Sequence, residues 1–284
     1  MMNKNLFRII LAVALVAFGA SARADFQDGM KAYMSGNFPV ALKEFKSLAA
    51  NGNAVAQFWL GWMYGEGDGV QQDYSAAMSW YVKAAEGGHV EAMSSIAEMY
   101  DKGHGVPQDY PQAAAWYRKA ADKGSALAQY RLGMMYAFGL GLAKDEQQAL
   151  SWYLKAAEHG NVAAQFQLGR IYRVGKSVTQ DYAKAVSWYF KALQRGSVEA
   201  QRDLGEMYRQ KLGGADIYRE VELWYRQVAE QAKRESEEQA RIEAEDQAKA
   251  NEQAKSAQPA GVSEPADART VNSGSKQTSE AASR

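Results

Sequence analysis

The chain has 284 residues, of which 47% are hydrophobic and 23% charged, and it contains no cysteine. This composition is that of an ordinary soluble globular protein with a substantial core, and the lack of thiols excludes disulfides and cysteine nucleophiles or metal ligands. The net charge at pH 7 is zero. That balance argues against nucleic-acid binding, which depends on an excess of Lys and Arg at the phosphates.

Residues 1–24 have the layout of a cleaved secretory signal. Lys4 and Arg8 precede an apolar run at residues 9–18, and small residues follow at Ala22 and Ala24. The run is too short to span a bilayer core of roughly 30 Å as a helix. We therefore expect cleavage after Ala24 and a periplasmic or secreted protein without stable membrane insertion. A retained membrane anchor is the alternative.

Residues 25–51 are expected to form a short helical hairpin. Apolar residues such as Phe26, Met30 and Tyr33 precede Gly36, and Phe45 and Leu48 follow it. Pro39 suits the first turn of the second helix, where its missing N–H is not needed.

A sequence unit recurs five times over residues 52–231. Its copies begin at Gly52, Gly88, Gly124, Gly160 and Gly196, a spacing of 36 residues. A strict period of this length predicts a solenoid, in which each unit is one supersecondary element that buries its apolar face against its neighbours.

Each unit contains two helical segments joined by a glycine-rich connection. The first carries apolar residues at i, i+4, i+7 and i+8, as in Ala56, Leu60, Met63 and Tyr64, which places them on one helix face. An aspartate such as Asp73 is placed to cap the second helix. That helix ends in a recurring pair, Trp80-Tyr81, Trp116-Tyr117, Trp152-Tyr153, Trp188-Tyr189 and Trp224-Tyr225. Such recurrence predicts that the pairs are core, packed between units.

The unit pattern LGxMYxxGxGVxxDYxxAxxWYxKAAExG resembles the Sel1-like repeat, a relative of the tetratricopeptide repeat. The resemblance implies an all-α fold, a right-handed α-α superhelix (solenoid) of helix-turn-helix repeats whose first helices line the concave side. Residues 25–51 then correspond to a tetratricopeptide-like hairpin. The fifth copy departs from the pattern at Lys211 and Ile217, as expected where a stack ends.

Beyond the repeats the chain is polar. Residues 232–255 are predicted to be a charged helical extension with i, i+4 pairs such as Glu237–Arg241 and Glu245–Lys249. Between Val228 and residue 255, Ile242 is the only large apolar residue, so a solvated helix is favoured over a coiled coil. Residues 256–284 lack apolar periodicity and are predicted to be a disordered tail.

We find no catalytic, metal or cofactor site in the sequence. The glycine-rich loop at residues 65–69 follows no strand, and its sister loops keep only the glycines, so it is a repeat turn. His89, His104 and His159 fall at unrelated repeat positions without ligand spacing. Ser273-x-x-Lys276 matches a serine–lysine catalytic pattern, but it lies in the predicted tail, where nothing holds a nucleophile and base in register.

The candidate partner-binding residues lie beside the core stripe of the first helices and differ between repeats. They are Val55, Trp59, Trp62, Glu91, Glu98, Leu127, Arg131, Met134, Phe138 and Arg170. Trp59 and Trp62 lie outside the repeated Trp-Tyr position. They either anchor a partner or pack against the hairpin at residues 25–51.

Sel1-like proteins of bacterial envelopes commonly act as adaptors. The resemblance therefore implies a non-enzymatic scaffold that binds a protein or peptide, in envelope assembly, signalling, motility or host contact, and we expect a monomer. One alternative is an enzyme or sensor acting on cell-wall material, because some secreted Sel1-like proteins bind penicillin and hydrolyse β-lactams. Those proteins carry a cysteine pair in each unit, which this chain lacks. Another alternative is a permanent subunit of an envelope machine.

Overall fold

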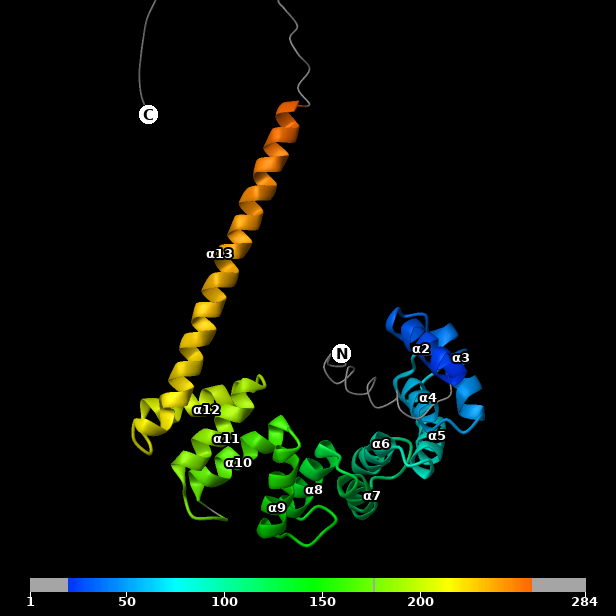
Figure 1. Ribbon diagram of the computed structural model, residues 1–284. Coiled ribbons are helices and arrows are strands. Elements are labelled where there is room, and N and C mark those ends of the chain that lie inside the picture. The colour runs from blue at the N-terminus through cyan, green and yellow to red at the C-terminus, as the bar shows by residue number, and fades with distance from the viewer. Residues whose placement is uncertain (1–19, 176, 257–284) are drawn as a thin grey trace, which may run out of the picture. The chain divides into compact units, whose positions relative to one another are not determined.

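The computed structural model describes residues 20–175 and 177–256, and all regular structure in these residues is helical (Figure 1). Most of the predicted signal peptide and nearly all of the predicted disordered tail lie outside the described residues. α2 (Ala20–Met34) runs through the predicted cleavage site between Ala24 and Asp25. No helix in the described part of the chain combines the length and apolar character needed to cross a membrane.

The first two helices form a hairpin with its own apolar contacts. α2 packs on α3 (Phe38–Ala50), and α3 packs in turn on the helix that follows it. Phe26, Met30, Phe45 and Leu48 are buried between them. Pro39 occupies the first turn of α3, a position that needs no backbone donor.

Five first helices alternate with the second helices of the repeats. The first helices are α4 (Ala54–Glu66), α6 (Val90–Lys102), α8 (Ala126–Phe138), α10 (Val162–Val174) and α12 (Val198–Arg209). The second helices of the first four repeats are α5 (Tyr74–Glu86), α7 (Tyr110–Asp122), α9 (Glu146–Glu158) and α11 (Tyr182–Gln194). Each helix packs on the next along the chain, which confirms the predicted all-α solenoid of helix pairs.

Capping side chains determine where these helices begin. The predicted aspartate caps the second helix, and in the first repeat Asp73 accepts a hydrogen bond from the Ala76 amide at 2.9 Å. The first helices begin at Asn53, His89, Ser125, Asn161 and Ser197, each of which accepts from the amide three residues later. Such caps satisfy amides that the helix itself leaves without partners.

Close packing between the two helices of a repeat depends on a small residue in the first. A Cβ on Gly61, Gly133 or Gly169 would lie within 2.8 Å of the ring of Tyr81, Tyr153 or Tyr189, respectively. These tyrosines are buried. The absence of a side chain on the first helix therefore lets the tyrosine ring of the second lie directly against its backbone.

The two members of the recurring Trp-Tyr pair have different environments. The prediction of a core position holds for the tyrosines at 81, 117, 153 and 189, whereas among the tryptophans before them only Trp152 is fully buried. The other tryptophans are half-buried, and a lysine ammonium lies over each ring, at 3.8 Å for Lys119 on Trp116. The ring has one packed face and one face that attracts a cation.

The fifth repeat ends differently from the others. After α12, a short 3-10 helix η1 (Asp216–Tyr218) leads directly into α13 (Arg219–Ser256), which is continuous for 38 residues. The expected boundary between residues 231 and 232 therefore falls inside one helix. Among the described residues, those up to Val221 form one compact unit and those from Glu222 another. The second unit carries exposed i, i+4 ion pairs such as Lys233–Glu237.

Candidate interaction surface

The candidate residues lie one position before the core stripe on each first helix. In α8, Ala128, Leu132 and Met135 are fully buried, while Leu127 is exposed and Arg131 and Met134 are half-buried. The same offset holds in α6, where Glu91 is exposed and Glu98 half-buried beside the buried Ala92 and Met99. From α6 onward the candidate positions therefore face outward, as binding residues must.

Trp59 does not belong to this surface. Its side chain is 1% exposed and its ring stacks on Phe45 of α3 at 6.1 Å, with Tyr33 of α2 at 5.2 Å. A ring in this position cannot contact a partner without opening the core. The structure thus corrects the interpretation of Trp59 as a partner anchor and supports the alternative, packing against the N-terminal hairpin, because a first repeat needs apolar cover on its open side.

Trp62 also contacts the N-terminal hairpin. Its indole Nε1 donates a hydrogen bond to the Tyr33 hydroxyl at 3.0 Å, and that hydroxyl donates to Asp68 at 2.6 Å. Burial, followed by the Asp68 carboxylate, raises the pKa of Tyr33 well above its ordinary value, so the hydroxyl keeps its proton. Trp62 is half-buried, as is Val55, and both pack against the core.

α8 carries the most apolar part of the surface. Phe138 is 69% exposed at the end of the helix, and Leu127 is exposed at its start. Met134 packs against the core cluster below it. Burial raises the pKa of the Tyr117 hydroxyl well above its ordinary value, and the positive charge of Arg131 partly opposes this rise. Two large apolar side chains and a guanidinium therefore share one helix face.

The neighbouring first helices differ in charge. On α6, Glu98 pairs with Lys102 at 2.5 Å. Glu91 lies 3.5 Å from Nδ1 of His89, but this nitrogen already accepts a hydrogen bond from the Ala92 amide, so the contact is not an ion pair. On α10, Arg170 is exposed and lies 6.0 Å from the Phe166 ring. Val174 is exposed at the end of α10. It was not among the candidates, although its spacing of 36 residues from Phe138 is a signal that could have found it.

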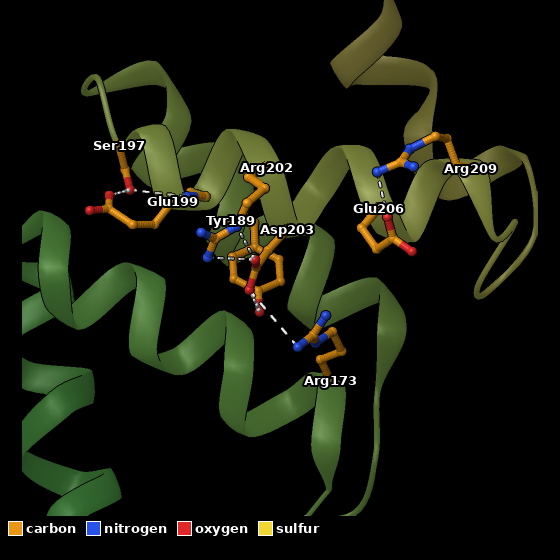
Figure 2. Close-up of polar contacts among 9 residues, drawn as sticks. Arg173, Tyr189, Ser197, Glu199, Arg202, Asp203, Glu206 and Arg209 are labelled. Carbon is orange, nitrogen blue, oxygen red and sulfur yellow. Dashed lines mark hydrogen bonds and ion pairs between the residues drawn. The ribbon is translucent and has the colours of Figure 1, made fainter.

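The polar residues of α12 are already engaged with one another and with the preceding repeat. Figure 2 shows Asp203 between Tyr189, which donates to it at 3.3 Å, and Arg173, whose guanidinium lies 3.9 Å away. Arg202 contacts the other carboxylate oxygen at 3.3 Å. Burial raises the pKa of Tyr189 well above its ordinary value. We therefore regard this network as a structural link between repeats four and five.

The three histidines have separate structural contacts. His89 caps α6, His104 stacks on Tyr74, and His159 contacts Gln129 at 2.8 Å. The described residues contain no group of His, Asp and Glu side chains that could hold a metal ion. One hollow of about 250 Å³, lined by Val186, Phe190, Ile217 and Glu220 among others, is smaller than typical ligand pockets.

Comparison with known proteins agrees with the repeat architecture. The family described as "Sel1 repeat" matches residues 54–89, 90–125, 126–161 and 162–197. The crystal structure of a Sel1 repeat protein from Oxalobacter formigenes is 36% identical, with a TM-score of 0.63, and the match covers 66% of this chain and 77% of that one.

A second solved structure is a protective antigen present in uropathogenic Escherichia coli strains, displaying an SLR fold. It is 33% identical with a TM-score of 0.65, and the match covers 81% of this chain. The chain spans about half, 49%, of the length of that antigen. A comparison with curated proteins found no match.

Proposed function

The chain belongs to the Sel1 repeat family, whose fold is a protein-interaction scaffold, and we propose that it binds a protein or peptide partner on the outward face of α6, α8 and α10. The observation that carries this proposal is the exposure of Leu127, Phe138 and Val174 on two adjacent first helices. Large apolar side chains that are left outside a core cost solvation free energy, and grouped ones mark interaction sites. They are the anchors expected to dominate binding.

The charges beside these anchors define the chemistry of the partner. Arg131 and Arg170 lie on the same two helices, and no acidic partner within salt-bridge distance is seen for either in the described residues. Arginine readily forms bidentate pairs with carboxylates. We propose that the partner segment presents large apolar residues next to Asp or Glu. The acidic residues Glu91 and Glu98 of α6 disfavour a partner that extends a carboxylate over this helix.

We place this binding in the periplasm or outside the cell, on the pattern of residues 1–24. The proposal is a scaffold without turnover, because the described residues offer a surface and no nucleophile with an adjacent base. The partner would be held by side chains on rigid helices. Little ordering of the scaffold would accompany binding.

Photo-crosslinking in the native cell envelope tests the surface. A probe at Arg131, beside Met134 and Phe138, should capture one protein, and a probe at Lys83, exposed on α5, should not. Adding Phe138→Ala should reduce the captured amount strongly, since truncating an aromatic anchor typically costs about 2 kcal/mol or more. Val40→Ala, an exposed apolar residue on α3, is the matched control. Equal capture from both probes, or capture that Phe138→Ala leaves unchanged, would contradict the proposal.

A further inference from the structure

The outward face of α6, α8 and α10 can be described in rows that run across the helices, because residues 36 positions apart occupy equivalent places in successive repeats. One row consists of Glu98 on α6, Met134 on α8 and Arg170 on α10, and we call it the Met134 row. Arg170 is exposed, and Glu98 and Met134 are half-buried, so all three side chains reach the surface. The row therefore presents an acidic, an apolar and a basic side chain in that order.

The three helices that carry the row lie side by side within the compact unit that ends at Val221. Ser94 Oγ of α6 lies 3.3 Å from Oγ of Ser125, the residue that caps α8. Met134 of α8 packs against the core cluster that contains Leu168 of α10. Neighbouring packed helices have axes about 8–10 Å apart, so the two charged ends of the row are separated by roughly 16–20 Å. At that separation the two charges cannot pair with each other.

The row is bounded at both ends by residues that already have partners. The equivalent residue in α4 is Trp62, which donates to the Tyr33 hydroxyl of the N-terminal hairpin. The equivalent residue in α12 is Glu206, which pairs with Arg209 on the same helix. A ligand that follows the row therefore crosses three helices.

The charges at the two ends of the row remain accessible to a ligand. No acidic side chain lies within salt-bridge distance of Arg170 in the described part of the chain. Glu98 pairs with Lys102, but the two side chains are 41% and 47% exposed, respectively. Exposed pairs of this kind contribute little to stability, so a cation from a ligand can replace Lys102.

The spacing of the row fits one backbone conformation of a bound segment. A polyproline II helix has three residues per turn and a rise of about 3.1 Å, so residues i, i+3 and i+6 share one side at intervals of about 9.3 Å. This interval falls within the spacing of packed helices. In a β-strand the residues that share a face are only about 6.6 Å apart, which does not place one of them on each helix.

We propose that the partner of this surface is an extended segment in the polyproline II conformation, which crosses α6, α8 and α10 along the Met134 row. It carries a basic residue over Glu98, a large apolar residue against Met134 and an acidic residue over Arg170, three positions apart. Phe138 lies one helical turn from Met134 and contacts the same apolar residue. This inference rests on the proposed function and adds the charge order, spacing and conformation of the partner.

Fluorescence polarisation with the full-length chain and a labelled peptide, Lys-Pro-Pro-Phe-Pro-Pro-Glu, tests the proposal. The prolines favour the polyproline II conformation, and the end residues supply one charge of each sign. Two comparison peptides carry Glu at both ends or Lys at both ends. We expect the peptide with one charge of each sign to bind most tightly, and Ala in place of its Phe to weaken binding by roughly tenfold or more.

Reversing the charges of the row should exchange the preferred peptide. Glu98→Lys should favour the peptide with two Glu, and Arg170→Glu the peptide with two Lys, each by at least about threefold. Tight binding of the complementary peptide also shows that each variant is folded. Glu86→Lys on α5 and Lys46→Glu on α3 make the same charge changes at exposed positions outside this surface, and they should leave the preference unchanged.

Three results would overturn the inference. One is failure of the peptide with one charge of each sign to bind, and another is equal binding of all three peptides. The third is tighter binding when the same three residues stand seven positions apart in an alanine-rich peptide, which would identify an α-helical partner instead. Crosslinking at Arg131 and its loss in Phe138→Ala test the proposed function separately, so the surface can stand while this inference fails.

Discussion

Gly169 and Gly205 occupy the same position in successive repeats, yet alanine should change stability in opposite directions at the two sites. A Cβ on Gly169 would lie 2.5 Å from Cδ1 of Tyr189, whose side chain is fully buried and lies 5.7 Å from Phe166. Overpacking a core costs about 1–3 kcal/mol, against a gain of about 1 kcal/mol for alanine over glycine within a helix. We expect Gly169→Ala to lower the free energy of unfolding by up to about 2 kcal/mol.

Gly205→Ala should instead raise the free energy of unfolding by up to about 1 kcal/mol, because no described atom lies within 4 Å of the added Cβ. Urea unfolding followed by circular dichroism would measure both variants. The difference between the sites isolates the crowding cost from helix propensity, which is common to both. Equal shifts of the same sign would refute the idea that the tyrosine ring is held against the glycine.

The second repeat shows how alanine can be accommodated at this position. Ala97 replaces the glycine there, and Tyr117 is still buried. Ser94 stands where the other internal repeats have an aromatic residue, such as Phe166, in contact with the tyrosine. We infer that the smaller side chain lets the Tyr117 ring shift. A double-mutant cycle should then show that Phe166→Ser reduces the cost of Gly169→Ala.

Three further substitutions test local features. Trp59→Ala should cost about 3–5 kcal/mol in thermal or urea unfolding, because the ring is core, and a variant that melts like the wild type would contradict its placement. Lys211 is the only non-glycine residue at positive φ in the described part of the chain. Lys211→Gly should therefore raise the free energy of unfolding by about 1 kcal/mol in the same assay. The control Gln210→Gly, at a residue whose φ is −82°, should not raise it. Burial lowers the pKa of His89, whose Nδ1 accepts from the Ala92 amide at 3.3 Å, so the folded state holds it neutral. In the unfolded chain His89 binds a proton near pH 6.5, so the free energy of unfolding, measured by urea titration, should fall as the pH drops below that value. The fall should be smaller in His89→Asn, which keeps a capping oxygen but does not titrate there.

The repeat architecture was predictable because its determinants are local and recur with one period. Asp73 and Asp109 cap the helices they precede, and Leu60 and Leu132 lie on the face that the i, i+4, i+7 spacing indicates. Each of these signals depends on a few adjacent residues. Because the pattern occurs in five copies, an irregular residue in one copy does not obscure the helices that the pattern predicts.

The environment of Trp59 was not predictable in the same way. Trp59 packs on Phe45, and nothing in the local pattern of α4 indicates whether a hairpin or a partner covers that face. The outward direction of Leu127 and Phe138, by contrast, follows from their offset from the core stripe. The predicted repeat boundary at residue 231 lies inside α13, where the sequence has no glycine or proline to end a helix.

Residues that recur in most repeats have little freedom to define a partner, because the packing of the stack already uses them. The buried Gln57, Gln129 and Gln165, for example, each donate to a carbonyl at the end of the preceding helix, at 3.2, 3.0 and 3.1 Å. Specificity is therefore left to positions that vary on the first helices.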